Sequence, residues 1–270
     1  MTRFLTGLVG VLVFIAALWL WTPVIQIVIL AFIALALYEM YRVMSTSGLK
    51  PVPCGGFLAA ALLWPGYALL GWQGMVFALL IGMMVTIAWP DNITRSFADV
   101  GASLMALLYP LLPMACLLFA TLLPAAEGRL VVGWGLGMSF LTDTSAYFTG
   151  KSFGKHKLSP RISPKKTVEG SVGAVVCCML AAIPAGLVLQ GMYTGTRWYM
   201  YVVLALLCSL AAQAGDLTAS TIKRLLGVKD FGNLLPGHGG VLDRFDSIMF
   251  SLPVTYLVVT LFMLWSPLVV

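Results

Sequence analysis

The sequence predicts an all-α, polytopic integral membrane protein with about nine transmembrane helices. Two observations lead to this fold class. Hydrophobic residues make up 60% of the 270 residues and charged residues only 10%, and long apolar runs follow one another along the whole chain. A transmembrane helix needs about 20 mainly apolar residues, whereas a soluble domain of this length shows amphipathic periods instead. The pattern excludes an ordinary water-soluble core.

The candidate spans can be placed in order along the chain. Arg3 precedes the first run as it would in a signal peptide, but no small-residue cleavage site follows, so a membrane helix is expected there. The second and third spans are the weakest, because Glu39 lies near the end of one and Pro65 interrupts the other. The expected spans are residues 4–20, 24–41, 56–71, 74–90, 99–124, 130–150, 169–190, 198–222 and 247–268.

The distribution of lysine and arginine predicts the orientation of these spans. When the loops alternate across nine spans, fourteen of the sixteen basic residues fall on the N-terminal side, and only Arg129 and Arg197 on the other. Basic residues collect in cytoplasmic loops, so the N-terminus is expected in the cytoplasm and the C-terminus outside. The net charge of +6 is therefore a topology signal and does not indicate nucleic-acid binding.

Two regions are expected within the chain. Residues 1–128 would form about five N-terminal transmembrane helices, and residues 129–270 a catalytic region of about four helices with cytosolic loops at 151–168 and 223–246. The five cysteines lie in or beside apolar spans without CxxC spacing, and we expect them to be small packing residues.

Two aspartates are expected at one depth of the membrane. Asp143 lies eight residues, or about 12 Å at helical rise, before the cytosolic end of its span at Lys151. Asp216 lies seven residues before Lys223 on a span that runs in the same direction. An ionisable group at membrane depth is costly, so the pair indicates a polar cavity that opens to the cytosol. The alternative for each is an isolated bond between helices.

Further carboxylates follow in the densest polar stretch. Asp216, Ser220 and Lys223 have the i, i+4, i+7 spacing of one helix face, and Asp243 and Asp246 are spaced to share a face where the last span begins. Three converging carboxylates, Asp216, Asp243 and Asp246, would suit Mg²⁺, which binds a few carboxylates and leaves positions for phosphate oxygens.

Two loops offer groups for phosphate. Gly239 and Gly240 follow His238 in a turn whose backbone N–H groups could approach a ligand, although His238 could equally serve the turn itself. The segment 163–170 brings hydroxyls and ammonium groups to the start of a helix, where phosphate binds well. The alternative for the lysines at 151–157 is contact with anionic lipid headgroups.

These stretches resemble a known family. The pattern S-x-[apolar]-K-R-x4-K-D-x-G-x2-L-P-x-H-G-G-[apolar]-x-D-R-[apolar]-D is met at every fixed position from Ser220 to Asp246. A second pattern is similar to Asp143–Gly150, Phe153–Leu158 and Ser163–Gly170. The chain resembles the bacterial phosphatidate cytidylyltransferases, or CDP-diacylglycerol synthases. The resemblance covers residues 140–250 closely and the first 130 residues only in general character.

The resemblance implies that CTP and phosphatidic acid give CDP-diacylglycerol and pyrophosphate at the cytosolic side of the bacterial inner membrane, with Mg²⁺ as cofactor, no nucleic-acid partner and a homodimer as one possible assembly. The expected catalytic residues are Asp216, Lys223, Asp243 and Asp246. The residues expected to bind CTP and the lipid phosphate are Asp143, Ser163, Lys165, Lys166, Thr167, Glu169, Ser220, Arg224, Lys229, Asp230, His238, Gly239, Gly240 and Arg244.

Two other functions fit part of the pattern. A CTP-dependent polyprenol kinase would also bring a nucleotide to a membrane lipid but would release CDP instead of pyrophosphate. An ion-coupled transporter would also carry intramembrane acids, but its usual inverted repeats are missing from the sequence. A CDP-alcohol phosphotransferase would need a DGxxAR-type signature, which the sequence lacks.

Overall fold

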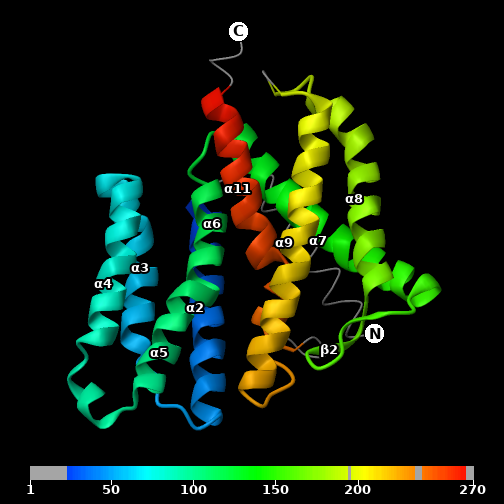
Figure 1. Ribbon diagram of the computed structural model, residues 1–270. Coiled ribbons are helices and arrows are strands. Elements are labelled where there is room, and N and C mark those ends of the chain that lie inside the picture. The colour runs from blue at the N-terminus through cyan, green and yellow to red at the C-terminus, as the bar shows by residue number, and fades with distance from the viewer. Residues whose placement is uncertain (1–22, 194–195, 235–238, 266–270) are drawn as a thin grey trace. The chain divides into compact units, whose positions relative to one another are not determined.

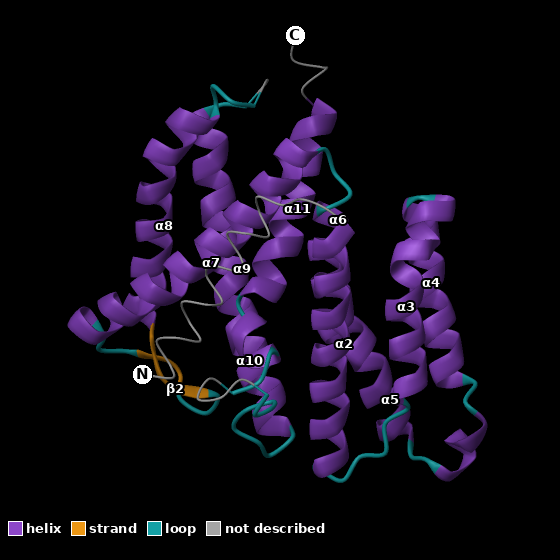
Figure 2. Ribbon diagram, turned by 180° about the vertical axis from the view of Figure 1, so that it is seen from behind, coloured by secondary structure: helices purple, strands orange, loops and turns teal. Residues whose placement is uncertain are grey.

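The protein is built almost entirely of helices (Figures 1 and 2). The computed structural model describes residues 23–193, 196–234 and 239–265. The predicted all-α class is confirmed, with one addition, a hairpin of strands β1 (Lys157–Ser159) and β2 (Ser163–Thr167). The helices are α2 (Pro23–Thr46), α3 (Pro53–Leu70), α4 (Trp72–Ile87), α5 (Phe97–Ala106), α6 (Leu112–Ala120), α7 (Ala125–Phe153), α8 (Val168–Leu189), α9 (Trp198–Leu225), α10 (Leu242–Phe245) and α11 (Ile248–Trp265), with a 3₁₀ turn at Pro90–Thr94 and a π-helical turn at Leu107–Leu111.

Several helices can cross a membrane. In the described part of the chain, five are long and apolar enough, namely Val24–Thr46, Pro53–Leu70, Phe97–Ala120, Val168–Leu189 and Trp198–Leu225. Two shorter apolar helices lie at Trp72–Ile87 and Ile248–Phe262. The first expected span, 4–20, lies outside the described residues. The chain is therefore a multi-pass membrane protein, and the count of nine spans stays a prediction.

The chain packs as two compact units. The first contains α2 to α6 together with the segment Lys223–Arg244, and the second contains the rest of the described chain from Leu122 to Ile222 and from Phe245 onward. The sequence suggested a division at 128/129 that left the whole loop 223–246 with the C-terminal helices. Packing instead puts most of that loop with the N-terminal helices.

Close helix contact in the first unit depends on small residues. The helices α3 and α4 lie side by side (Figure 1). A Cβ atom on Gly66 would stand 2.6 Å from the carbonyl oxygen of Gly74, and one on Gly82 would stand 2.6 Å from the Cβ of Ala59. Small residues of this kind allow the backbones of membrane helices to approach, which increases van der Waals contact.

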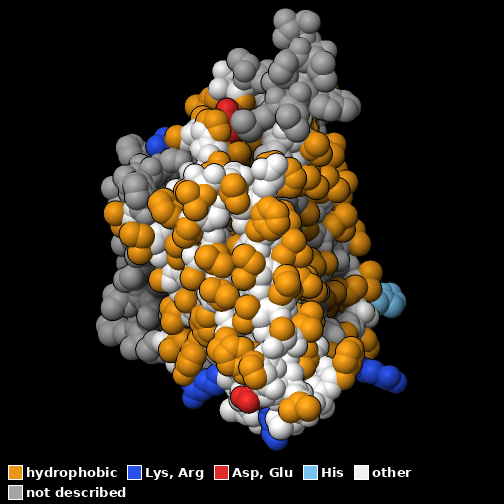
Figure 3. All heavy atoms as spheres, turned by 90° about the vertical axis from the view of Figure 1, so that its left-hand side faces the viewer, with side chains coloured by type: hydrophobic (Ala, Val, Ile, Leu, Met, Phe, Trp, Pro, Cys, Tyr) orange, Lys and Arg blue, Asp and Glu red, His pale blue; other side chains and the backbone are white. Residues whose placement is uncertain are grey.

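The outer face of the first unit is hydrophobic. Figure 3 shows apolar side chains over most of the face that carries α3 and α4, and the exposed ones include Leu69, Phe77 and Met84. An extended apolar surface of this kind is typical of contact with lipid or with another protein. Together with the length of the helices, it indicates a lipid-facing surface.

Buried hydroxyl groups fix the helices of the second unit. Ser139 on α7 and Ser251 on α11 lie with their Oγ atoms 2.5 Å apart, and Thr142 on α7 donates a 3.1 Å hydrogen bond to Ser209 on α9. In a membrane protein such bonds between helices contribute about 0.6 kcal/mol each. These bonds fix the part of α7 that carries Asp143, the residue that follows Thr142.

Candidate active site

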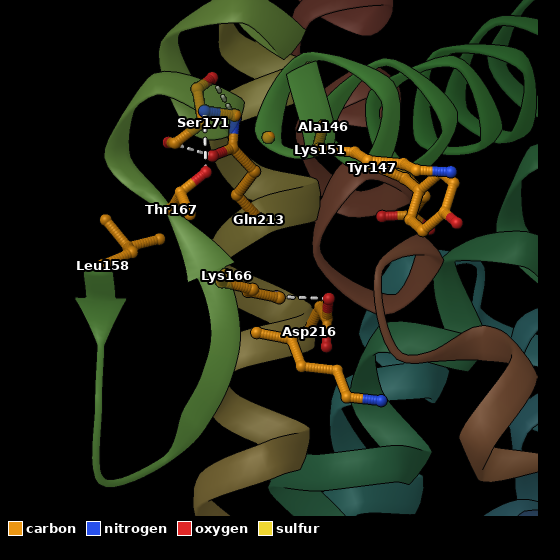
Figure 4. A pocket seen from close by; sticks show the side chains of 13 residues that line it. Ala146, Tyr147, Lys151, Leu158, Lys166, Thr167, Ser171, Gln213 and Asp216 are labelled. Carbon is orange, nitrogen blue, oxygen red and sulfur yellow. Dashed lines mark hydrogen bonds and ion pairs between the residues drawn. The ribbon is translucent and has the colours of Figure 1, made fainter. Parts of the chain in front are cut away.

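A cavity of about 320 Å³ lies within the second unit. Its walls come from α7, the β-hairpin, the start of α8 and α9, as Figure 4 shows. Three lysines, Lys151, Lys165 and Lys166, and two acids, Asp143 and Asp216, contribute to the lining. Ammonium groups are good donors to phosphate oxygens, and carboxylates bind cations. The cavity can therefore receive an anionic phosphate group together with a cation.

Asp216 and Lys166 form an ion pair in this cavity (Figure 4). The acid comes from α9 and the lysine from β2, and each side chain keeps 26% of its surface exposed. A partly exposed ion pair depends less on its partner for stability than a fully buried one does. Both groups are thus available to exchange their partner for a ligand.

Ser247 connects two further carboxylates. Its hydroxyl donates to Asp143 at 3.1 and 3.0 Å from the two oxygens, and its backbone N–H donates to Asp246 Oδ1 at 2.8 Å. Asp143 is also close enough to interact electrostatically with both Asp216 and Asp246. Gly215 has no side chain where the carbonyl oxygen of Asp246 approaches α9. Asp143 thus lies near two further carboxylates of the second unit, Asp216 and Asp246.

The hairpin that carries Lys165 and Lys166 is anchored to the start of α8. Glu169 accepts hydrogen bonds from the backbone N–H groups of Lys155, at 3.0 Å, and His156, at 3.2 Å, and its Oε1 lies 2.6 Å from the Nδ1 of His156. Glu169 does not line the cavity. Its position indicates that it holds the hairpin, which differs from the direct substrate contact expected from the sequence.

Thr167 caps α8 beside the cavity. Its hydroxyl accepts a 3.2 Å hydrogen bond from the N–H of Gly170, and its backbone pairs with Lys157 across the hairpin. A threonine cap satisfies a helix N–H that would otherwise lack a partner. The same residue therefore joins the hairpin, α8 and the cavity wall.

Gln213 is a cavity residue that the sequence reasoning missed. Its Nε2 donates to the carbonyl of Ser171 at 3.3 Å and to the hydroxyl of Ser209 at 3.4 Å, and the hydroxyl of Ser171 donates to its Oε1. Gln213 precedes Asp216 by three residues on α9, so both share a helix face. This spacing, together with a polar side chain in an apolar helix, could have identified Gln213 from the sequence.

Two of the expected catalytic residues lie together in the first unit. Lys223 Nζ is 2.9 Å from Asp243 Oδ1, and the two side chains are 13% and 4% exposed. Asp243 Oδ2 also accepts from the N–H groups of Phe231, at 2.8 Å, and Gly240, at 3.0 Å. The ammonium group lies 5.3 Å from the centroid of the Phe231 ring. Both carboxylate oxygens of Asp243 thus accept hydrogen bonds.

The expected common helix face of Asp243 and Asp246 is interrupted. The short α10 ends at Phe245 and α11 begins at Ile248, so Asp246 lies between the two helices. Asp243 belongs to the first unit and Asp246 to the second.

The remaining expected site residues have the following places. Ser163 opens β2, and Ser220 is half-buried on α9, one turn after Asp216. Gly239 has a φ of +81°, which suits glycine, and His238 lies outside the described residues. Four of the expected site residues are exposed at the surface of the first unit, namely Arg224, Lys229, Asp230 and Arg244.

The donor chemistry of the second unit fits a magnesium ion in part. Among the described residues, no group of three or more His, Cys, Asp or Glu side chains is arranged to hold a metal. Mg²⁺, however, often takes only one or two carboxylates and completes its shell with phosphate oxygens and water. Asp216, which already contacts a cationic group, and the neighbouring Asp143 and Asp246 offer such oxygens.

A helical, multi-pass membrane protein with lysines and carboxylates around one cavity has the features of a membrane enzyme that acts on phosphorylated substrates. The chain belongs to the cytidylyltransferase family, whose family model matches residues 1–262. The family is one of nucleotidyltransferases, and the resemblance seen in the sequence is thereby confirmed.

Individual relatives carry more specific names. The chain is 35% identical over 273 residues to a phosphatidate cytidylyltransferase of Bacillus subtilis, which covers 96% of this chain and 97% of the relative. It is 34% identical to one from Mycobacterium bovis over 94% of this chain and 84% of the relative. A third, from Staphylococcus saprophyticus, is 45% identical over 128 residues, which are 47% of this chain and 48% of the relative.

Proposed function

We propose that the protein transfers the CMP moiety of CTP to phosphatidic acid, which gives CDP-diacylglycerol and pyrophosphate for phospholipid synthesis. The observation that carries this function is the near full-length similarity to phosphatidate cytidylyltransferases. The cavity of the second unit supports it, because three lysines beside two aspartates suit the meeting of two phosphorylated substrates.

The reaction forms one bond and breaks one. A phosphate oxygen of the lipid attacks the α-phosphorus of CTP, and the bond from that phosphorus to the oxygen bridging to the β-phosphate breaks, so pyrophosphate leaves. The attacking phosphate is already an anion, so no general base is needed. The protein contributes mainly position and charge neutralisation, for which Lys165, Lys166 and Lys151 line the cavity.

The proposed cofactor is Mg²⁺, held by Asp216 and Asp246 with Asp143 beside them. When bound, the ion would neutralise charge on the phosphates and orient them. Asp243, the third ligand expected from the sequence, fits less well, because its two oxygens already accept bonds from Lys223, Phe231 and Gly240.

We place the protein in the bacterial cytoplasmic membrane with the cavity facing the cytosol. The bacterial relatives and the basic loops support this orientation, because cytoplasmic loops are rich in lysine and arginine. A homodimer remains a prediction, to be checked by measuring the mass of the purified protein in detergent.

The test of the function is a product analysis. Purified protein is given labelled CTP, phosphatidic acid and Mg²⁺, and pyrophosphate and CDP-lipid are measured for wild type, Asp246→Asn and the control Asp91→Asn. Asp91 lies on an exposed turn between α4 and α5. Equal amounts of both products are expected from wild type and control, with strong loss in Asp246→Asn.

Other outcomes would replace the proposal. Formation of CDP without pyrophosphate would indicate a lipid kinase. If no lipid-dependent turnover occurs with any divalent metal, the transporter becomes the better interpretation.

A further inference from the structure

A buried glutamate of the first unit contacts the backbone of a segment of the same unit that contains Gly232 and Gly240. Glu39, on α2, is only 1% exposed. Its Oε1 accepts a hydrogen bond from the N–H of Val241, and its Oε2 accepts one from the N–H of Leu242, each at 2.9 Å. The carboxylate thus binds the backbone of the signature segment directly, 202 and 203 residues away in the sequence.

Two glycines make room for this carboxylate. A Cβ atom on Gly232 would stand 2.5 Å from Oε1 of Glu39, and one on Gly240 would stand 2.6 Å from Oε2. Real Cβ contacts are not this short, so any side chain at either glycine would displace the carboxylate. Packing therefore explains the last glycine of each of the patterns K-D-x-G and H-G-G, because Gly232 and Gly240 make room for Glu39.

The backbone that Glu39 holds also carries the Lys223–Asp243 pair. Asp243 Oδ2 accepts from the N–H of Phe231, the neighbour of Gly232, and from the N–H of Gly240. The backbone near Gly232 and Gly240 thus contacts two carboxylates, Glu39 and Asp243. Displacement of Glu39 would shift the very groups that orient Asp243.

The start of the loop is tied to the same helix end. The hydroxyl of Ser47, which directly follows α2, donates a 2.7 Å hydrogen bond to the carbonyl of Leu226. Both ends of the segment between Leu226 and Leu242 are therefore attached to α2 or to the residue that directly follows it. This arrangement gives the N-terminal unit a role beyond anchoring in the membrane.

Burial of a carboxylate is energetically unfavourable compared with burial of an apolar side chain. Removal of a carboxylate from water costs several kcal/mol, and only charge-assisted hydrogen bonds to well-placed donors offset it. An apolar side chain on α2 would pack without that cost but would leave the two N–H groups without an acceptor. The position thus favours a residue whose task is to fix backbone geometry.

We propose that Glu39 is a positioning residue for nucleotide use: it fixes the backbone at Gly232 and at residues 240–242, and this backbone holds the Lys223–Asp243 pair, which the family resemblance assigns to catalysis. The inference rests on the proposed function and adds to it a residue from the N-terminal helices. Glu39 acts through the loop and does not itself contact substrate.

The first test compares Glu39→Gln with wild type and with Glu127→Gln, a matched change in the first turn of α7. At metal sites, groups that act by orienting another side chain are worth about 10–100-fold. By analogy, kcat/KM for CTP is expected to fall by about that factor. KM for phosphatidic acid and the detergent melting temperature are expected to stay near the wild-type values. The control should match wild type throughout.

A second measurement does not depend on turnover. Hydrogen exchange at the amides of Val241 and Leu242 should become faster in Glu39→Gln, because an amide offers one acceptor where the carboxylate offers two. Exchange in α3 and α4 should be unchanged. Binding of labelled CTP at equilibrium should weaken by the same factor as kcat/KM.

A third measurement uses the glycine contact. Gly240→Ala should reproduce the loss seen in Glu39→Ala, and the double variant should lose much less than the product of the two, because the alanine then has no carboxylate to displace. Strictly multiplicative losses would contradict the contact.

The outcomes separate the two proposals. If wild type forms no CDP-lipid, the proposed function fails, and CTP binding with amide exchange still decides the role of Glu39. The role itself is overturned if Glu39→Gln leaves CTP binding and the two amides unchanged. It is also overturned if the variant raises KM for both substrates equally while the melting temperature falls, since that result describes a merely structural residue.

Discussion

The two units use their carboxylates in different ways. In the first unit, Glu39 and Asp243 are buried and accept hydrogen bonds from two backbone N–H groups each. In the second unit, Asp216 is partly exposed in a cavity, and its ion pair is with a lysine side chain. A backbone partner cannot move without the chain, whereas a lysine side chain can swing aside.

The two kinds of carboxylate are therefore expected to have different roles: those of the first unit position a loop, and those of the second unit bind a ligand. Carboxylates held by backbone N–H groups fix a loop, and their removal leaves buried donors without partners. Carboxylates paired with a mobile side chain can accept a metal ion or release the lysine to a phosphate. We therefore expect loss of a carboxylate of the second unit to reduce turnover with little effect on stability. Complete removal of the buried acceptor in the first unit, as in Asp243→Ala, should reduce both, whereas Glu39→Gln keeps an acceptor.

The largest effect is expected for Asp216→Asn. Loss of a charge that would hold Mg²⁺ should lower kcat by about 10³-fold, because metal stabilisation of the transition state is worth several kcal/mol. The melting temperature in detergent should change little, since the ion pair is partly exposed. The rate of pyrophosphate release measures kcat. A large drop in melting temperature would show instead that Asp216 supports the fold, as Asp243 does.

A smaller but clear effect is expected on stability for Asp243→Ala. One partner of a buried pair would remain charged and alone, which costs about 3–5 kcal/mol. The free energy of unfolding in mixed detergent micelles measures the loss. Lys223→Met in the same chain should recover much of it, and a failure to recover would show that the N–H bonds of Phe231 and Gly240 matter more than the lysine.

Lys166→Gln should have a moderate effect on nucleotide use. A hydrogen bond to a charged group contributes about 1.5–3 kcal/mol, so kcat/KM for CTP should fall by about 10–100-fold. The matched control is Lys155→Gln, whose side chain is exposed outside the cavity. Equal losses in both variants would indicate a general effect of loop charge at the membrane surface.

The smallest effect is expected for Thr167→Ala. Loss of the cap of α8 should cost about 1 kcal/mol and lower activity a few-fold through displacement of the hairpin lysines. Thr167→Ser keeps the hydroxyl and should retain both stability and activity. Thermal unfolding and initial rates of the three proteins give the comparison, and a serine variant as impaired as the alanine one would contradict the role of the cap.

The sequence predicted the site residues of the second unit more completely than those of the first. Asp143 and Asp216 could be singled out because charged groups stand out in apolar spans. Lys165 and Lys166 could be singled out because ammonium groups gather before a helix start, and the structure brings all four residues to one cavity. Gln213 was missed because a neutral amide is a weaker signal. In the first unit, Glu39 was visible only as an interruption of a span.

The sequence by itself determined the class of fold, the chemistry of the polar groups and the family, because hydrophobic runs and contiguous motifs are local properties of the chain. Tertiary structure decided which groups meet. The contacts of Glu39 with Val241 and Leu242 join positions about two hundred residues apart, and the pairing of Lys166 with Asp216 joins a hairpin to a helix. Such contacts depend on how helices pack, and no local pattern encodes that packing.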